Sequence, residues 1–322
     1  MSEPLDRSTI WPYDKNGDAG RLYYQRAGSP TVEAAEAELG KLDGGTALLF
    51  PSGAGATTTI ALALLHPGDT IALAEGAYYG TGATFEILGN WGLRVVEFDQ
   101  TDAPPENADL IWLEAPSNPF LTMPDLEAAA AHPAPVLVDA TAATPIHLRP
   151  LEHGADFVLH SATKYLAGHD DALLGAVICR DSAVAEEIRA FRTRTGIVAA
   201  PDPAWLLLRG LKTLELRVRR QTESATLLAA RLRDHWSVQL VRYPGFGGLL
   251  SFDVDDAEKA RQVETSTRVI TNATSLGGVA SHIESRARWE GDRVPPGLLR
   301  LSVGVEDPEV LWADLEQALG SS

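Results

Sequence analysis

The chain has 322 residues, of which 45% are hydrophobic and 22% charged, as in an ordinary globular protein. Its formal charge of −17 at pH 7 disfavours nucleic acid and anionic membrane partners, because their phosphates would repel such a surface. The single cysteine, Cys179, excludes an internal disulfide and a metal site built on paired cysteines. No signal-peptide pattern and no apolar run near the roughly 20 residues that cross a bilayer occur, so we expect a cytoplasmic protein.

Strand and helix signals alternate through the first two hundred residues. A helix is expected from Thr31, which we interpret as its N-cap after Pro30. The small-residue turn at 51–56 follows a strand and opens a second helix that extends to Leu65. Short apolar runs predict strands at 46–50, 70–74, 94–98, 110–113, 135–138, 157–159 and 174–178. This alternation is typical of a mostly parallel sheet, here of seven strands, with crossover helices.

The pattern changes after about Pro201. One long helix is expected over 204–235, with basic residues on one face: Arg209, Lys212, Arg217, Arg219 and Arg220. Strands at 238–242 and 248–254, then a helix, a strand and a final helix, indicate a smaller α+β unit. The prediction is therefore an α/β protein with an arm at 1–29, a cofactor-binding domain at 30–214 and a C-terminal α+β domain at 215–322.

The run from His160 to His169 is the strongest indication of a site. It follows the strand at 157–159, and ligand sites of open α/β sheets form at the carboxyl ends of strands. Lys164, beside the hydroxyls of Ser161 and Thr163, suits an amine that condenses with a carbonyl next to a phosphate. Pyridoxal 5′-phosphate carries both groups. A surface lysine is the alternative, and it would be preferred if this motif stood alone.

Further features belong to the same kind of site. The turn at 51–56 could hold a phosphate on the free N–H groups of a helix start, although most such turns bind nothing. Asp139 ends a strand, where a carboxylate could keep a pyridine nitrogen protonated; a turn residue is the alternative. Asn118 lies in a Pro-flanked turn at the same edge of the sheet. Arg300, in an apolar run, fits a substrate carboxylate, with a structural salt bridge as the alternative.

Eight motifs follow one another along the chain: Tyr24-Gln-Arg-Ala-Gly-Ser-Pro-Thr, Tyr78-Tyr-Gly-Thr, Glu114-Ala-Pro-Ser-Asn-Pro, Val138-Asp-Ala-Thr, the run from Ser161 to His169, Arg209-Gly-Leu-Lys-Thr-Leu, Ser275-Leu-Gly-Gly-Val and Arg300-Leu-Ser-Val-Gly-Val-Glu-Asp. In this order they resemble the Cys/Met-metabolism family of pyridoxal-phosphate enzymes, which includes cystathionine γ-lyases, γ-synthases, β-lyases and methionine γ-lyases. The resemblance covers 24–318 and implies a PLP-dependent transferase of fold type I.

The resemblance also implies roles for the matching residues. Lys164 would hold the cofactor as an internal aldimine and move protons together with Tyr78, while Asp139 would pair with the ring nitrogen. The other implied contacts are Asn118 with the 3′-oxygen, Gly53, Ala54, Ser161 and Thr163 with the phosphate, Thr141 with the cofactor, Ser275 and Arg300 with the substrate carboxylate, and Tyr24 and Arg26 with the phosphate of a neighbouring subunit. A homodimer would be the minimal active unit, within a homotetramer. A core aromatic is the alternative for Tyr78, and we interpret Tyr79 as one.

The chain departs from the family pattern at several positions. Ala140 replaces the usual asparagine after the strand-end aspartate, which would loosen cofactor contacts. Thr274 stands where enzymes that act on cystathionine often carry an acid. Gly80 stands where methionine γ-lyases commonly have cysteine, which argues against that specialisation. The segment before Tyr24 is shorter than usual.

The reaction that the resemblance favours is γ-elimination of a sulfur amino acid, converting L-cystathionine to cysteine, 2-oxobutanoate and ammonia. A cystathionine γ-synthase acting on an O-acylhomoserine is the first alternative. A related β-lyase, methionine γ-lyase or sulfhydrylase also remains open. Two other classes are a cofactor-binding protein without turnover and a structural protein that has lost the cofactor. Binding alone would not need all four of Lys164, Tyr78, Asp139 and Arg300, which argues against both classes.

Overall fold

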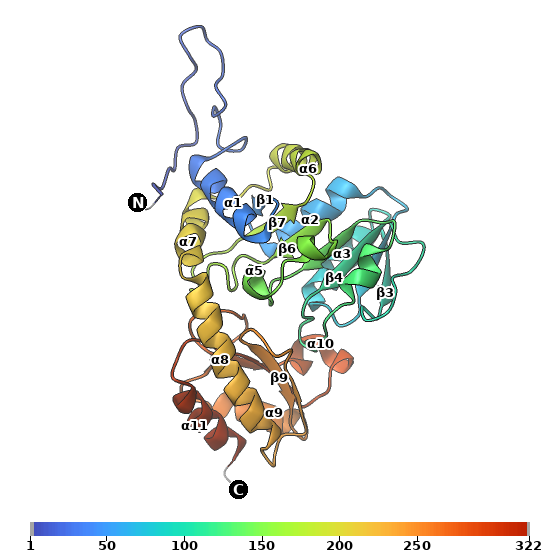
Figure 1. The fold of residues 1–322 in the computed structure, drawn as a ribbon, viewed down its shortest axis with the longest axis vertical. Coiled ribbons are helices and arrows are strands. Elements are labelled where there is room, and N and C mark those ends of the chain that lie inside the picture. Colours follow the sequence, from blue (N-terminus) through green and yellow to red (C-terminus); the bar gives the residue numbers. More distant parts are fainter. Residues whose placement is uncertain (1–2, 321–322) are drawn as a thin grey trace.

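The structure, a computed structural model, describes residues 3–320 and contains two sheets (Figure 1). The larger sheet has seven strands: β1 Thr46–Phe50, β2 Thr70–Ala74, β3 Arg94–Phe98, β4 Leu110–Glu114, β5 Val136–Asp139, β6 Phe157–His160 and β7 Gly175–Cys179. Their order is β1-β7-β6-β5-β4-β2-β3. Strands β3, β2, β4, β5 and β6 are parallel, whereas β7 runs antiparallel to β6 and β1. The predicted mostly parallel seven-stranded sheet is confirmed.

Helices cover both faces of this sheet, which explains why strands β2, β4, β5, β6 and β7 are buried along their whole length, whereas the edge strand β3 is mostly exposed. The helices are α1 Pro30–Asp43, α2 Gly53–Leu64, α3 Tyr79–Gly89, α4 Leu126–Ala130, α5 Thr144–His147, the 3₁₀-helix η1 Pro150–His153, and α6 Ser182–Thr195. Alternate residues of β1 enter different core clusters: Leu48 packs with Ile60 of α2, and Leu49 packs with Leu39 of α1.

The smaller sheet has five strands in the order β10-β11-β12-β9-β8. They are β8 Leu240–Arg242, β9 Leu249–Asp253, β10 Thr271–Asn272, β11 His282–Ser285 and β12 Leu298–Ser302. The accompanying helices are α7 Pro201–Leu211, α8 Leu214–Arg233, α9 Ala257–Ser266, α10 Ala287–Glu290, the 3₁₀-helix η2 Gly291–Arg293, and α11 Pro308–Leu319. One core cluster contains both Val158 of the larger sheet and Phe252 of the smaller one. The division into domains at 214/215 stays a prediction.

The single helix predicted over 204–235 is wrong, because α7 and α8 are separate helices. The break lies beside Gly210, whose Cα approaches the carbonyl of Ala167 so closely that an added Cβ would lie 2.3 Å from that oxygen. The carbonyl of Gly210 accepts hydrogen bonds from Thr213 N at 3.1 Å and from Arg217 Nη2 at 2.9 Å. The contact with Thr213 is a tight i→i+3 turn, which ends the α-helical pattern there.

Two further expectations fail because side chains find tertiary partners. Helix α1 begins at Pro30 with Ser29 in the cap position, since proline suits the first helical position. The hydroxyl of Thr31, expected as the cap, accepts from Asp6 N at 2.9 Å instead. Arg217, expected on one helix face together with the other basic residues, is 6% exposed and donates to the carbonyl of Tyr165 at 2.8 Å. It therefore stabilises the segment that follows Lys164.

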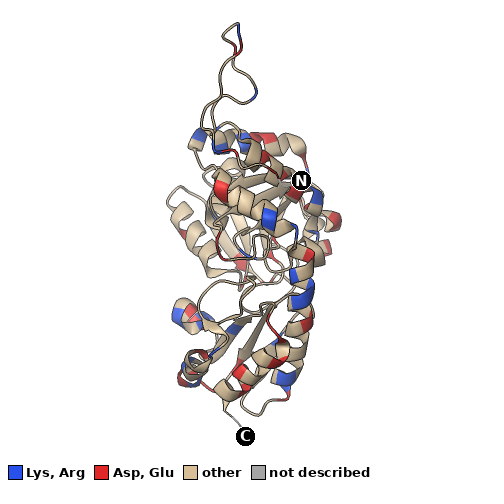
Figure 2. Cartoon of the chain, turned by 90° about the vertical axis from the view of Figure 1, so that its left-hand side faces the viewer, with Lys and Arg blue, Asp and Glu red and all other residues tan. Residues whose placement is uncertain are grey.

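The N-terminal arm projects from the body of the molecule beside α1 (Figures 1 and 2). Ile10 and Tyr24 form an antiparallel bridge near its base. The side chains of Ile10 and Tyr13 are 70% and 60% exposed, so the arm buries little apolar surface on its own chain. Basic and acidic positions are interspersed along the helices and loops of the chain in Figure 2. Within residues 3–320, no helix is both long and apolar enough to cross a membrane.

Candidate active site

A cavity of about 300 Å³ lies at the carboxyl ends of β4, β5 and β6, against residues of the smaller sheet. It brings together eleven of the predicted site residues: Gly53, Ala54, Tyr78, Asn118, Asp139, Thr141, Ser161, Thr163, Lys164, Ser275 and Arg300. The strand-end position expected for the site is therefore where these side chains meet.

One end of the cavity is formed by the start of α2. Ser52 caps this helix by accepting from Gly55 N at 3.0 Å, and the first intrahelical bond runs from Ala56 N to Ser52 O. The N–H groups of Gly53 and Ala54 precede that bond, so they are available to an anion. A Cβ at Gly53 would lie 3.2 Å from Ser161 Oγ, so a side chain at this position would crowd the Ser161 hydroxyl. This cradle fits a phosphate group.

The hydroxyl of Thr163 is already engaged at the same end of the cavity. It donates to Leu174 O at 3.1 Å and accepts from Leu174 N at 2.9 Å. It thereby joins the segment after β6 to the start of β7. Ser161 is the hydroxyl more open to a phosphate, because no hydrogen bond of its Oγ occurs within residues 3–320.

Asp139 presents a fixed carboxylate to the cavity. Its Oδ1 accepts from the backbone N of Thr141 at 2.9 Å and from Thr141 Oγ1 at 2.5 Å. Thr141 Oγ1 in turn accepts from Ser161 N at 2.8 Å. Burial raises the pKa of Asp139, and the bonds from Thr141 oppose that rise. Asp139 Oδ1 is therefore held by Thr141, and Asp139 Oδ2 can accept from a ring N–H.

Lys164 follows β6 in a turn closed by its own N–H and the carbonyl of Ser161, at 3.0 Å. Its Nζ donates to Ser275 Oγ at 2.8 Å, so the amine crosses the cavity toward the smaller sheet. Burial, and next the charge of Arg300, lower the pKa of Lys164. Ser275 itself has φ = 95°, a conformation that non-glycine residues rarely adopt. The surroundings thus hold Ser275 in place, and its hydroxyl orients the lysine amine.

Tyr78 lies at the N-terminus of α3, with its ring over Gly80. A Cβ at Gly80 would come within 2.4 Å of that ring, so a larger residue there would require the Tyr78 side chain to move. Burial and then the neighbouring Tyr79 raise the pKa of Tyr78 to about 12, so its hydroxyl is neutral near pH 7. Tyr79, expected in the core, is 37% exposed and packs edge-on against Tyr78 with ring centroids 4.8 Å apart.

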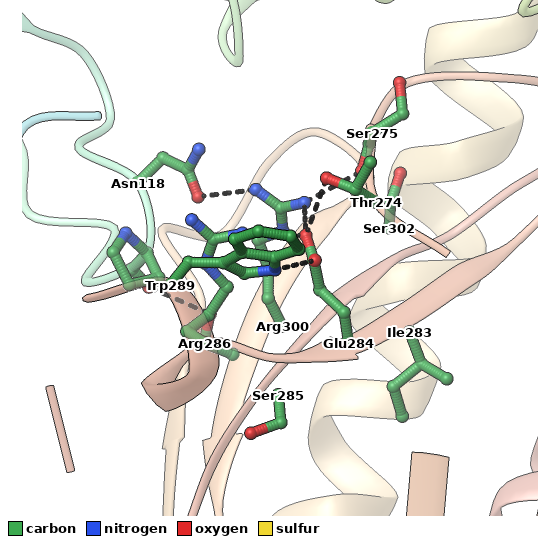
Figure 3. A network of polar contacts seen from close by, with 12 residues as sticks. Asn118, Thr274, Ser275, Ile283, Glu284, Ser285, Arg286, Trp289, Arg300 and Ser302 are labelled. Atoms are coloured by element: carbon green, nitrogen blue, oxygen red, sulfur yellow. Dashed lines mark hydrogen bonds and ion pairs between the residues drawn. The ribbon is translucent and has the colours of Figure 1, made fainter. Parts of the chain in front are cut away.

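Arg300 reaches the cavity from β12 (Figure 3). Its Nη1 donates to Asn118 Oδ1 at 3.1 Å, and its Nη2 donates to Ser275 O at 3.0 Å and to Glu284 Oε1. Burial lowers the pKa of Arg300 to about 10, with Glu284 opposing the shift. The guanidinium is therefore charged at neutral pH and tied to Asn118 and Ser275, two residues expected to contact cofactor and substrate.

Two charged residues that line the cavity, Glu114 and Arg286, were not predicted as site residues, and neither was Glu284, which pairs with Arg286 and Arg300. Glu114 ends β4 opposite Asp139 of β5 and accepts from Tyr78 N at 2.5 Å. Burial, and then the charge of Asp139, raise the pKa of Glu114 well above its ordinary value. Glu284 accepts from both Arg286 and Arg300, and Arg286 lines the cavity. Glu114 opens the motif Glu114-Ala-Pro-Ser-Asn-Pro, so the sequence could have indicated it. The contacts of Glu284 depend on the fold and leave no signal in the sequence.

Tyr24 and Arg26 lie away from this cavity in their own chain. Arg26 Nη1 donates to Thr193 O at 2.9 Å, and its guanidinium lies 5.3 Å from the Tyr24 ring centre. Arg26 lines a larger cavity of about 860 Å³ beside α1 and α6. Their contact with a neighbouring subunit stays a prediction.

A buried lysine after a parallel strand, an acid on the adjacent strand and a phosphate cradle at a helix start define a fold type I PLP-dependent enzyme. The family of Cys/Met metabolism PLP-dependent enzymes matches residues 1–320, and this chain belongs to that family. Cystathionine γ-synthase of Mycobacterium tuberculosis is 39% identical, over 99% of this chain and 92% of its own length. Cystathionine γ-lyase of Bacillus subtilis is 35% identical, over 99% and 94%.

Solved structures agree with this assignment. Cystathionine γ-synthase from Xanthomonas oryzae pv. oryzae, in complex with cystathionine, has a TM-score of 0.94 at 33% identity, covering 99% of this chain and 92% of that one. The predictions of a carbon–sulfur enzyme, of pyridoxal phosphate as cofactor and of an amino-acid substrate are confirmed at the level of the family.

Proposed function

We propose that the protein catalyses γ-elimination of L-cystathionine, giving cysteine, 2-oxobutanoate and ammonia. The observation that carries this proposal is the chain of contacts Lys164–Ser275–Arg300. It places a proton-accepting amine and a carboxylate-binding guanidinium on either side of one serine. An α-amino acid held by Arg300 would thus present its Cα near Lys164.

The residues around the cavity fit pyridoxal phosphate. Gly53, Ala54 and Ser161 would hold its phosphate, and Asp139 Oδ2 would accept from its ring nitrogen. When bound, the cofactor supplies a protonated pyridine ring that accepts the electrons left at the substrate's Cα. The bonds from Thr141 favour the ionised form of Asp139 and so oppose the effect of its burial.

The chain's own groups would then carry the protons. Lys164, with its pKa lowered by burial, is suited to remove the Cα proton and next a Cβ proton. Loss of the γ-sulfur requires a proton donor, and Tyr78 is neutral and lines the same cavity. Arg300, oriented by its bond to Asn118 Oδ1, would keep the substrate carboxylate in place throughout. Water completes the release of 2-oxobutanoate and ammonia.

A cystathionine γ-synthase is the second candidate. Thr274, where enzymes acting on cystathionine often carry an acid, donates its hydroxyl to Glu284 Oε1 at 3.2 Å. The Thr274 side chain therefore points to Glu284, the carboxylate that pairs with Arg286 and Arg300. The missing acid at position 274 concerns the lyase and the synthase alike, and the observation that supports the synthase is a relative of 39% identity that bears this name.

Product analysis separates the two. The purified protein, loaded with pyridoxal phosphate, is incubated with L-cystathionine alone and with an O-acylhomoserine plus cysteine. We expect 2-oxobutanoate and cysteine from cystathionine, and no product from the Lys164→Ala variant. Cystathionine formed from the ester and cysteine, without breakdown of added cystathionine, would favour the synthase and contradict the lyase.

A further inference from the structure

Two arginines, on neighbouring strands of the smaller sheet, line the cavity. Arg300 belongs to β12 and Arg286 follows β11 directly; they are 4% and 1% exposed. Both donate to the same oxygen, Glu284 Oε1, as Figure 3 shows. The proposed reaction uses Arg300 for the α-carboxylate and leaves Arg286 without a role.

Arg286 retains hydrogen-bond donors after its protein contacts are counted. Its Nη1 donates to Glu284 Oε1 at 2.8 Å, while Nε and Nη2 donate to Glu290 Oε1 at 2.9 and 2.8 Å. A guanidinium carries five N–H groups, so one remains on each terminal nitrogen. Within residues 3–320 no acceptor for these two groups occurs. A carboxylate, with its two oxygens, is a suitable acceptor for these remaining groups.

The position of Arg286 is fixed before any ligand arrives. Glu290 is four residues along the chain, and Trp289 Nε1 donates to Glu284 Oε2 at 3.1 Å. The guanidinium also lies 5.6 Å from the centre of the Tyr79 ring. Because the side chain is already ordered, binding a carboxylate there costs little conformational entropy.

We propose that Arg286 forms a second carboxylate subsite, which receives the far end of the substrate's side chain. This inference rests on the proposed function, in which Arg300 holds the α-carboxylate. The site would select γ-substituted amino acids whose leaving group ends in a carboxylate, such as cystathionine or a dicarboxylic ester of homoserine. Amino acids with a neutral end, such as methionine or an acetyl ester, would be disfavoured.

The expected preference is moderate. Glu284 and Glu290 already balance the charges of the two guanidiniums, so the gain comes from charge-assisted hydrogen bonds rather than from excess positive charge. Such bonds correspond to roughly tenfold or more in affinity.

The test compares two ligands that differ only in the distal group: O-succinyl-L-homoserine and its terminal amide. Dissociation constants are measured by calorimetry on Lys164→Ala protein loaded with pyridoxal phosphate, so that turnover does not intervene. The same measurement is made after adding Arg286→Gln, and after adding the matched control Arg288→Gln. Arg288 pairs with Glu264 and is not among the residues that line the cavity.

We expect the succinyl ester to bind roughly tenfold more tightly than the amide. This preference should disappear with Arg286→Gln and persist with Arg288→Gln. Equal binding of the two ligands, no binding of either, or a preference that survives Arg286→Gln would overturn the inference. Failure of the proposed reaction is seen separately, as absence of 2-oxobutanoate from cystathionine with the unsubstituted enzyme.

Discussion

Burial acts in opposite directions on the acids and bases around the cavity. It raises the pKa of Asp139 and Glu114 and lowers the pKa of Lys164 and Arg300. For Lys164, the shift enlarges the neutral fraction that can accept a proton near pH 7. For Asp139, the two bonds from Thr141 oppose the shift and leave Oδ2 free to accept from a ring nitrogen.

Asp139→Asn tests the partner of the ring nitrogen. The amide cannot balance a protonated pyridine, and losing one member of a buried pair costs several kcal/mol, so turnover should fall roughly a hundredfold or more. Initial rates with L-cystathionine provide the measurement. Asp109→Asn is the control, because Asp109 accepts from Thr70 N at 2.8 Å at the opposite edge of the sheet. Near-normal turnover of Asp139→Asn would show that another group fills this role.

Glu114→Gln tests the raised pKa of the buried acid in the apoprotein. The folded state holds the Glu114 proton more tightly than the unfolded chain, so this group's contribution to stability falls as pH rises above about 4.5. The glutamine variant lacks that loss. The melting temperature of the variant minus that of the unsubstituted protein should therefore be more positive at pH 8 than at pH 5. Exposed Glu127→Gln serves as control; the same difference at both pH values for Glu114→Gln would contradict the assignment.

Single residues differ in how far the sequence locates them. It was possible to predict Lys164, Asp139 and Arg300 because each follows or interrupts an apolar strand, where a buried polar side chain requires a partner. Arg286 could not, because its contacts with Glu284 and Glu290 depend on the turn from β11 into α10. Arg217 was misplaced for a similar reason: its acceptors are backbone carbonyls distant in the sequence.

At the scale of elements, the start of α2 depends on a close approach by β7. Gly175 opens β7, and a Cβ there would lie 2.1 Å from the carbonyl oxygen of Ser52, the residue that caps α2. The phosphate cradle and the sheet edge are thus fitted to one another without room for a methyl group.

Gly175→Ala should displace this helix start. Overpacking of this kind costs about 1–3 kcal/mol, so we expect a lower melting temperature and weaker binding of pyridoxal phosphate. Gly89→Ala is the matched control, since a Cβ at Gly89 meets nothing within 4 Å in the last turn of α3. That variant should be neutral or slightly stabilised. Unchanged stability and cofactor affinity in Gly175→Ala would contradict the close approach.

The strands were predicted well because alternation of buried runs and turns is a local signal. Strands β1, β2 and β3 have the expected limits, and β4 to β9 shift by one or two residues at their ends, whereas only one of the three strands β10, β11 and β12 was expected. The break between α7 and α8 was missed, since it arises where Gly210 meets Ala167 from another part of the fold. Short elements such as β10 and α10 carry too few residues to show a period.

At the scale of the whole molecule, the arm before α1 is the part least explained by its own chain. Its apolar side chains Ile10 and Tyr13 are exposed, and Arg26 contacts Thr193 and Tyr24 rather than the cavity. The alternation of strands and helices was sufficient to predict the larger sheet, and the order of the motifs along the sequence was sufficient to predict the candidate site residues. Assembly could not be derived in the same way, because contacts between copies leave no periodic pattern in one sequence.

We predict that each active site takes Arg26 from a second copy of the chain. Lys164→Ala and Arg26→Ala should each inactivate the homo-oligomer. Co-expressed, they should form mixed dimers in which one site carries both defects and the other none, so activity with cystathionine should return. Mixed dimers that demonstrably form yet remain inactive would show that Arg26 serves its own subunit.

The central claim is that Lys164 holds the cofactor in the cavity at the end of β6. The chain has five lysines, and Lys164 alone lines this cavity within residues 3–320. The most direct measurement is borohydride reduction of the protein loaded with pyridoxal phosphate, followed by peptide mapping. The account predicts a stable label on Lys164 and loss of the visible absorbance in Lys164→Ala. A label on Lys15, Lys41, Lys212 or Lys259 instead, with Lys164 unmodified, would contradict it.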